Sequence, residues 1–438
     1  MDLTLSDNRA KIAALGETFG TPCYIYDEET LTSCVKTLRA GIGKKPAILY
    51  SVKANPNPAL LKLWGELVDG MEVCSLGEYR FARKAGISPD RLFFVGPGKR
   101  RFELDEILKD DIAGVIAESA SELACLQEVA ASLKKVIFVE LRINPAVSVS
   151  GGRLNMSGTP TQFGFSEEEV LELFGRDSAC YPNLRLEGAH FYFGTQQLNG
   201  DVLNKLFMAS VEIVRKIRLL RTKKNLPPLT AVDFGGGFGV PYYEGETALD
   251  FSAIAEWKDV ISSDEFSNVK VFVESGRFLS ASCGLFLTRI LYKKSLRDKT
   301  FLIVDGGMNN HFALASIGRL LKRDFPVTPL VQGAATPGDA DRALRTEKVT
   351  IAGPLCTPVD TLATGAELPE MKEGDLIALA NAGAYGYTYS PQLFLSHPAP
   401  AELLLRTNGT TDIIREGGYL QIDAYHNKNQ GESHYGSK

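Results

Sequence analysis

Short apolar runs alternate with amphipathic helical stretches along the first two thirds of this chain. The apolar runs that we interpret as strands are 47–52, 70–73, 92–95, 114–117, 136–142, 186–193, 231–234 and 270–273. Apolar residues with helical spacing fill the intervals, among them 59–67, 76–85, 118–131 and 202–220. Eight strand–helix units within about 250 residues are what a closed (β/α)8 barrel requires. We therefore expect an α/β fold built on a TIM barrel.

Residues able to carry chemistry follow nearly every predicted strand at its carboxyl end. They are Lys53, Cys74-Ser75, Gly96-Pro97, Glu118, Arg142, His190, Gly235-Gly236-Gly237 and Glu274. A doubly wound sheet would show the same alternation and is the alternative architecture. The barrel is favoured because the carboxyl ends of its strands all meet at one mouth, which would bring these residues together.

After Arg277 the pattern changes to strands joined by turns, predicted at 285–292, 301–304, 349–352, 375–380 and 401–405. We expect the barrel to occupy residues 28–278. Residues 1–27 and 279–438 are expected to form a second, mostly β domain. Residues 333–345 are predicted to be a loop or insertion, and the polar tail from Asn427 to be disordered.

Composition narrows the class of protein. The net charge is −5, the hydrophobic content 44% and the charged content 23%, which is ordinary for a globular protein and leaves no basic area for nucleic acid. No apolar run reaches membrane-spanning length. Seven cysteines without paired spacing indicate reduced thiols in a cytoplasmic protein. No metal site is expected.

Lys53 stands at the end of an apolar predicted strand. Burial can hold a lysine amine neutral, and a neutral amine forms an imine with an aldehyde cofactor or a carbonyl substrate. A strand-end lysine can also simply reach the surface. The rest of the chain favours the reactive role.

The glycine run Gly235-Gly236-Gly237 follows a predicted strand, so its backbone N–H groups can bind a phosphate. Glu274 follows the last barrel strand and can pair with a protonated ring nitrogen, while Arg277 can bind a phosphate or carboxylate. Lysine, glycine run and carboxylate at one barrel mouth are together what pyridoxal 5′-phosphate requires.

The chain resembles the pyridoxal-phosphate enzymes that include the diaminopimelate, ornithine and arginine decarboxylases, which share their barrel with the alanine racemases. The matching motifs, in family order, are Tyr50-Ser51-Val52-Lys53-Ala54-Asn55, Ser75-Leu76-Gly77-Glu78, Gly235-Gly236-Gly237-Phe238, Glu274-Ser275-Gly276-Arg277, Asp305-Gly306-Gly307, Gly353-Pro354-Leu355-Cys356 and Gly383-Ala384-Tyr385-Gly386. These motifs cover almost the whole chain.

The resemblance implies a role for each matching residue. Lys53 is the imine lysine and Glu274 the partner of the ring nitrogen. The residues implied in cofactor binding are Thr195, Gly235, Gly236, Gly237, Arg277 and Tyr385 for the phosphate, with Arg142 in the same site. Cys356 is implied to reach the partner's active site across a homodimer and to return a proton after CO₂ leaves.

Several positions depart from the family pattern. Tyr192, two residues after His190, stands where a histidine stacks on the cofactor ring. Thr357 replaces an acid that binds a distal ammonium, and the segment after Asp305-Gly306-Gly307 lacks the usual clamp for a distal carboxylate. Asn309, Asn310 or His311 could contact the far end of a substrate instead. Gln162 replaces a lysine expected to form an interface salt bridge with Asp360.

These departures resemble a narrower subgroup from natural-product and siderophore pathways, some of whose members act on an amino acid tethered to an acyl carrier protein. The sequence therefore predicts a decarboxylase for a substrate with a neutral or tethered distal end. Three alternatives remain: a diaminopimelate decarboxylase, an amino-acid racemase, and a non-catalytic partner-binding homologue. Glu274 argues against the racemase, which typically pairs the ring nitrogen with arginine, and retention of Lys53, Glu274 and Cys356 argues against the non-catalytic homologue.

Overall fold

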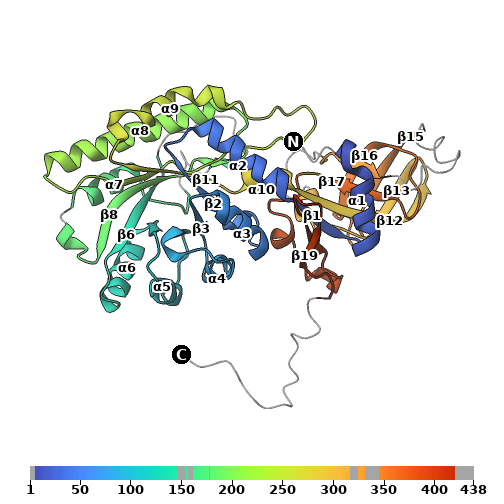
Figure 1. Ribbon diagram of the computed structural model, residues 1–438, viewed down its shortest axis with the longest axis horizontal. Helices are drawn as coiled ribbons and strands as arrows, with labels where there is room; N and C mark the ends of the chain where they lie inside the picture. The colour runs from blue at the N-terminus through green and yellow to red at the C-terminus, as the bar shows by residue number, and fades with distance from the viewer. Residues whose placement is uncertain are drawn as a thin grey trace, which may run out of the picture.

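The computed structural model describes residues 5–145, 154–155, 161–176, 178–315, 324–330 and 345–419. Eight parallel strands close into a barrel in the order β10-β11-β2-β3-β4-β5-β6-β8 (Figure 1). Their bounds are β2 Ala47–Ser51, β3 Gly70–Val73, β4 Leu92–Phe94, β5 Gly114–Ala117, β6 Ile137–Ile143, β8 Leu184–Phe191, β10 Ala231–Asp233 and β11 Lys270–Ser275. Each lies within two residues of its predicted range. The TIM barrel is thus confirmed, and closure of the sheet excludes the doubly wound alternative.

Helices surround the barrel in Figure 1. They are α2 Glu28–Ile42, α3 Pro58–Leu67, α4 Leu76–Lys84, α5 Arg101–Ile107, α6 Ala120–Ser132, α7 Glu167–Phe174, α8 Gly200–Lys223, α9 Ala255–Ser262 and α10 Arg277–Ser280. Capping side chains explain several of the short strand-to-helix turns. Asn57, Ser75 and Ser119 each accept a hydrogen bond from a backbone N–H in the first turn of α3, α4 and α6.

The second part of the structure is a mixed nine-stranded sheet, drawn to the right of the barrel in Figure 1. Its strands are β1 Cys23–Asp27, β12 Gly284–Leu296, β13 Lys299–Val304, β14 Val327–Leu330, β15 Thr346–Ala352, β16 Thr361–Pro369, β17 Leu376–Leu379, β18 Ala401–Leu405 and β19 Thr411–Arg415. A small ribbon pairs β7 Leu154–Asn155 with β9 Gly194–Thr195. Helix α1 Leu5–Phe19 packs Ile12 and Leu15 against Leu287 and Leu376 in the core of the nine-stranded sheet.

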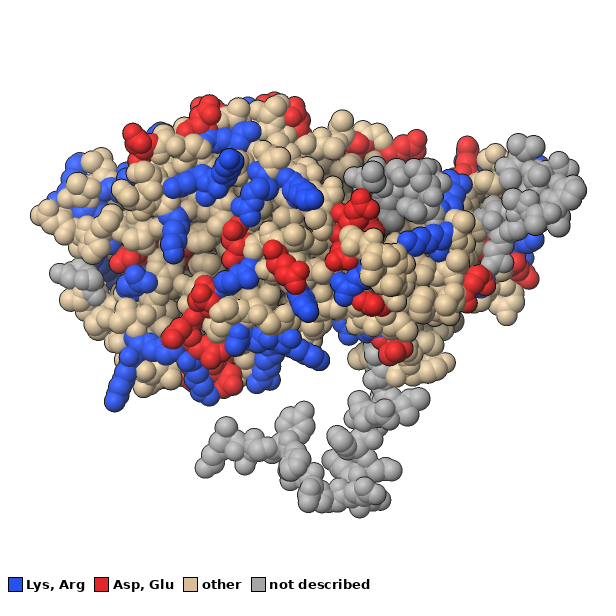
Figure 2. Space-filling model, viewed as in Figure 1, with Lys and Arg blue, Asp and Glu red and all other residues tan. Residues whose placement is uncertain are grey.

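The N-terminal strand β1 lies inside this sheet, antiparallel to β12 and parallel to β18. The predicted loop at 333–345 and the predicted tail from 427 fall outside the described residues, apart from Arg345. Among the residues that the structure describes, no helix is long and apolar enough to cross a membrane. Figure 2 shows Lys and Arg interspersed with Asp and Glu on the visible face.

A loop of the second sheet, residues 381–387, docks on the barrel next to Lys53. The backbone N–H of Tyr385 donates to the carbonyl oxygen of Ala54 at 2.8 Å. The side-chain amide of Asn55 donates to the carbonyl oxygen of Gly383 at 3.1 Å. A Cβ atom on Gly383 would overlap the carbonyl oxygen of Ser280. The loop can approach this closely only because residue 383 has no side chain.

We expect Gly383→Ala to lower the free energy of unfolding by about 1–3 kcal/mol, because the methyl group must push two backbone segments apart. Chemical denaturation followed by circular dichroism measures the change. The control is Gly77→Ala in α4, where an added Cβ meets only the Ser75 hydroxyl at 3.6 Å and should leave stability unchanged or slightly higher. Equal stability of the two variants would contradict tight docking of the loop.

Candidate active site

The mouth of the barrel opens into a cavity of about 700 Å³. Most of its wall comes from the carboxyl ends of barrel strands, and four residues come from the second part of the chain. The lining residues are Lys53, Glu72, Cys74, Val95, Gly96, Pro97, Gly98, Arg142, Phe163, His190, Tyr192, Thr195, Glu274, Arg277, Phe312, Ala313, Tyr385 and Tyr389. The expected convergence of the strand ends on one site is present.

Lys53 follows β2 in a 3₁₀ turn and extends its amine into the cavity, with 38% of its side chain exposed. Its Nζ lies 3.0 Å from Oε1 of the buried Glu72 on β3. Burial lowers the pKa of Lys53, but Glu72, Cys74, Glu274 and Tyr385 raise it more, so the pKa lies well above its ordinary value. The expectation that burial holds the Lys53 amine neutral is therefore wrong. Nearby carboxylates outweigh desolvation and keep the amine charged.

Glu274 at the end of β11 forms a buried hydrogen bond with His190 on β8. The distance from Oε1 to His190 Nε2 is 3.1 Å, and both side chains are 3% exposed. Burial, aided by the Arg142 guanidinium, lowers the pKa of His190 to about 3, so the imidazole is neutral and donates to the carboxylate. Burial raises the pKa of Glu274, while Lys53 and Arg142 lower it. A hydrogen bond with Glu72 lowers the pKa of Glu274 as well. The Glu274 carboxylate, beside a neutral imidazole donor, is suited to pair with a cationic ring nitrogen.

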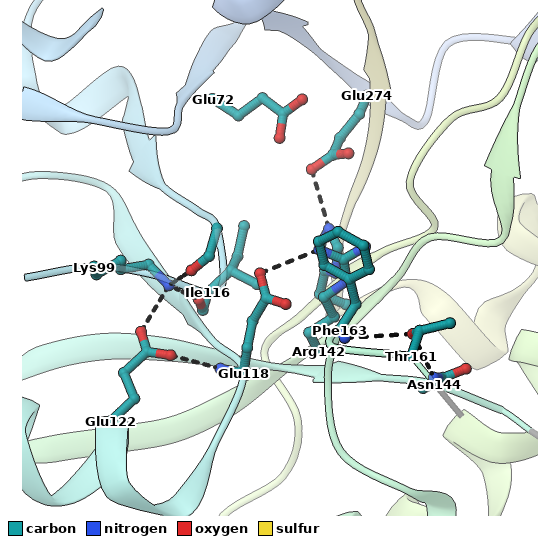
Figure 3. A network of polar contacts seen from close by, with 12 residues as sticks. Glu72, Lys99, Ile116, Glu118, Glu122, Arg142, Asn144, Thr161, Phe163 and Glu274 are labelled. Atoms are coloured by element: carbon teal, nitrogen blue, oxygen red, sulfur yellow. Dashed lines mark hydrogen bonds and ion pairs between the residues drawn. The ribbon is translucent and has the colours of Figure 1, made fainter. Parts of the chain in front are cut away.

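Arg142 at the end of β6 lies between two aromatic rings, with its guanidinium carbon 4.6 Å from the Phe163 ring centroid and 5.6 Å from that of Tyr192. Its Nη1 donates to Oε1 of Glu118 at 3.1 Å (Figure 3). Lys99, whose side chain is fully buried, donates to Glu122, and Glu122 accepts from the Glu118 backbone N–H. This network fixes the orientation of the cation beside Tyr192.

Arg277 at the start of α10 contacts neutral side chains. Its Nη1 donates to the Tyr242 hydroxyl at 3.0 Å, its Nε lies 3.5 Å from Thr195 Oγ1, and its guanidinium is 4.6 Å from the Tyr385 ring centroid. None of these contacts neutralises the guanidinium. It remains suited to a phosphate dianion.

Comparison with known proteins agrees with this geometry. The family model described as "Pyridoxal-dependent decarboxylase, pyridoxal binding domain" matches residues 29–281, more than half of the chain. The chain belongs to the pyridoxal-dependent decarboxylases. It is therefore a pyridoxal-phosphate-dependent carboxy-lyase, as its motifs imply.

Two named relatives and one solved structure show how close the similarity is. The chain is 36% identical to the L-glutamyl-[BtrI acyl-carrier protein] decarboxylase of Niallia circulans, over 94% of each chain. It is 31% identical to a diaminopimelate decarboxylase of Helicobacter pylori, over 89% of this chain and 92% of that one. The Helicobacter pylori diaminopimelate decarboxylase structure complexed with L-lysine matches with a TM-score of 0.81 at 29% identity, covering 93% of this chain and 96% of that chain.

The residues present fit the cofactor of this decarboxylase family. A Cβ on Gly235 would overlap the carbonyl oxygen of Phe191, and one on Gly236 would overlap that of Glu274. Gly235 and Gly237 have φ of 63° and 96°, which glycine adopts without strain. The glycine run therefore lies against the ends of β8 and β11, next to Phe191 and Glu274, in a position suited to a phosphate-binding turn.

The structure brings eight of the predicted site residues of this decarboxylase together in one cavity. Those in the cavity wall are Lys53, Arg142, His190, Tyr192, Thr195, Glu274, Arg277 and Tyr385. The glycine run Gly235-Gly236-Gly237 is not among the lining residues. Asn309 and His311 are buried and do not line the cavity, whereas their neighbours Phe312 and Ala313 do.

The remaining predicted residues lie away from the cavity of their own chain. Cys356 and Gln162 are exposed, Thr357 is half-buried, and Asp360 is buried. Sequence reasoning missed Glu72, Phe163 and Tyr389. Glu72 could have been found as an acidic residue inside an otherwise apolar strand.

Two further acids lie buried in the barrel interior below Glu274. Neither carboxylate oxygen of Glu140 on β6 has a hydrogen-bond partner among the described residues, and Asp233 Oδ2 has none either. Gly188, the register partner of Glu140 on β8, leaves the space that the Glu140 side chain fills. His190, Asp233 and Glu274 offer donor atoms within 4.8 Å of one another, but the His190–Glu274 hydrogen bond already uses one atom of each.

Burial raises the pKa of Glu140 well above its ordinary value, and Glu274 adds to the effect. A group with a raised folded-state pKa stabilises the fold when protonated, and that contribution is lost as pH rises towards the raised value. Glu140→Gln should therefore melt near wild type at about pH 4–5 and several degrees higher at about pH 8. Thermal melts of the cofactor-free protein across this range measure the difference.

The exposed Glu66→Gln provides the control and should show no such pH-dependent gain. A Glu140→Gln difference that stays constant with pH would show that Glu140 is ionised in the fold.

Proposed function

We propose that this decarboxylase removes the α-carboxylate of an amino acid whose distal end is neutral or tethered to a carrier protein. The observation that carries the proposal is the charge inventory of the cavity wall. The contacts of its charged groups are Lys53 with Glu72, Arg142 with Glu118, Glu274 with His190, and Arg277 with Tyr242 and Thr195. The other described lining residues are uncharged. A second charge at the far end of a substrate would find no partner there.

The relative from Niallia circulans supports this proposal, because its name describes a glutamyl group held on an acyl carrier protein. Biosynthesis of a natural product or siderophore is the setting that such a substrate suggests. The alternative is a diaminopimelate decarboxylase, which the 31% identity and the 0.81 TM-score favour. The two proposed functions differ in whether the enzyme accepts a substrate that carries a second, free amino-acid group at its distal end.

The charged residues of the cavity and several of their neighbours each have a part in the proposed reaction. When bound, pyridoxal phosphate accepts the electron pair of the breaking Cα–carboxylate bond. Lys53 is the point of covalent attachment, and Glu72 orients its amine. Glu274, aligned by neutral His190, holds a proton on the ring nitrogen. Arg277, with Thr195, Tyr385 and the glycine run, would hold the phosphate, and Tyr192 would offer an aromatic face to the ring.

The proton that replaces CO₂ is assigned to Cys356 of a second copy. Cys356 is exposed and absent from the cavity of its own chain. In the second part of the chain, large apolar side chains are exposed, namely Val359, Tyr389, Leu393, Phe394 and Leu395, with exposures of 43–62%. Tyr389 also lines the cavity, so a homodimer formed on this face would cover the site. The free state of all seven cysteines supports a cytoplasmic location.

Carbon dioxide release tests the substrate proposal. We expect slow or no release from free meso-diaminopimelate, ornithine and lysine, and much faster release from carrier-bound aminoacyl thioesters or distal amides. The absence of a partner for a buried charge should raise KM for the charged substrates by about 30-fold or more. Lys53→Ala is the blank for each substrate. Turnover of free meso-diaminopimelate at about 1–10³ per second would return the chain to the alternative function.

Mixing two inactive variants tests the assignment of Cys356. Lys53→Ala and Cys356→Ala proteins, mixed under conditions of subunit exchange, should regain up to about a quarter of wild-type activity, because half the dimers are hybrids with one intact site. A Lys53→Ala, Cys356→Ala double variant mixed with either single variant is the control and should stay inactive. No recovery despite demonstrated exchange would place Cys356 outside the active site.

A further inference from the structure

The carboxylate of Asp360 joins two loops of the second sheet. Its Oδ1 accepts from the backbone N–H of Met308 at 2.7 Å, and its Oδ2 accepts from that of Leu355 at 2.9 Å. Met308 follows the motif Asp305-Gly306-Gly307, and Leu355 precedes Cys356. Asp360 is only 2% exposed, so both oxygens are committed inside their own chain.

The surrounding backbone is shaped around this carboxylate. A Cβ on Gly307 would lie 2.7 Å from both oxygens, and a Cβ on Gly353 would overlap Oδ2. The backbone adds two further links, from Gly353 N–H to the Asp360 carbonyl at 3.0 Å and from Asp360 N–H to the Thr357 carbonyl at 3.2 Å. Residues 353–360 therefore form a closed turn, with Cys356 presented on its outer side.

Apolar packing connects the two loops that Asp360 joins to the wall of the cavity. Met308 and Leu355 form a small buried cluster, and Phe312 of the cavity wall packs against it. A shift of the Asp360 carboxylate would thus move both the thiol and one wall of the cavity. Burial raises the pKa of Asp360, and the two backbone donors and His397 lower it.

We propose that Asp360 is a positioning residue that holds the Cys356 turn from within its own subunit, rather than a partner for a charge on a second copy. Gln162, at the position where a lysine would reach for Asp360 across an interface, is neutral and exposed. The inference rests on the proposed function only in the role given to Cys356. The placement of the turn itself can be tested without turnover.

Asp360→Asn provides the direct test, because an amide keeps the shape but sets its NH₂ group against one of the two backbone donors. Amide hydrogen exchange in segments 305–309 and 353–358 should accelerate about tenfold or more, since a charge-assisted hydrogen bond is lost. In a Cys180→Ser background, which removes the other exposed thiol, the alkylation rate of Cys356 should change as well. The matched control is Asp412→Asn, which removes an exposed acceptor of Arg406 on the same sheet.

Kinetics and dimer affinity separate positioning from an interface role. In Asp360→Asn we expect kcat to fall with KM nearly unchanged, and the dimer dissociation constant to stay at the wild-type value. A double-mutant cycle combines Gln162→Lys with Asp360→Asn and measures dimer affinity. We expect Gln162→Lys to have the same effect on dimer affinity whether residue 360 is Asp or Asn. Gly353→Ala, which displaces the carboxylate without removing it, should reproduce the exchange and alkylation changes.

Unchanged exchange in both segments, or a dimer weakened by Asp360→Asn, would overturn the proposal. If Asp360→Asn and Gly353→Ala both fail to fold, Asp360 serves folding and not placement of the thiol. Faster exchange in a protein that releases no CO₂ from any substrate would uphold the placement and count against the proposed function alone.

Discussion

The barrel mouth holds more buried acids than bases, and this imbalance controls the site. Five acidic residues there are at most 5% exposed, namely Glu72, Glu118, Glu140, Asp233 and Glu274. The cations that face them are Lys53 and Arg142. A space of low dielectric constant cannot hold so many like charges, so each ionised acid needs a cation or a donor, and the remainder hold protons. A cofactor that brings a protonated ring nitrogen restores the balance next to Glu274. The same condition explains why Lys53 is charged and paired with Glu72.

The hydrophobic pattern was sufficient to predict the barrel, because each barrel strand is a short apolar run bounded by capping or turn residues. In the nine-stranded sheet, strands β1, β14, β16 and β19 were not predicted. Strand β1 illustrates the reason: its five residues gain their partners from Gly284–Leu296 and Ala401–Leu405, far along the chain. Pairing at such separations is decided by tertiary packing and leaves no local signal.

For the site, the motifs identified the residues that touch the cavity, but not their electrostatic state. Lys53 was expected to be neutral from its apolar strand, and the structure shows that Glu72 on the neighbouring strand reverses the sign of the pKa shift. Phe163 and Tyr389 were missed because an aromatic residue in a loop resembles any other surface or core residue in sequence. Asp360 was expected at an interface, yet its two backbone donors lie in loops more than 50 residues and five residues away, within its own chain.

The pairing of β1 between β12 and β18 also sets an order of assembly. The ribosome delivers β1 before the barrel, but both of its neighbours emerge only after the last barrel strand. The barrel can close before β1 has paired with either neighbour. The nine-stranded sheet can form only after the final quarter of the chain has been synthesised. Since that sheet carries the loop with Tyr385, synthesis finishes the active site last. A chain truncated before Ala401 would retain a complete barrel with an exposed, unpaired edge at β1, which is a target for aggregation or degradation.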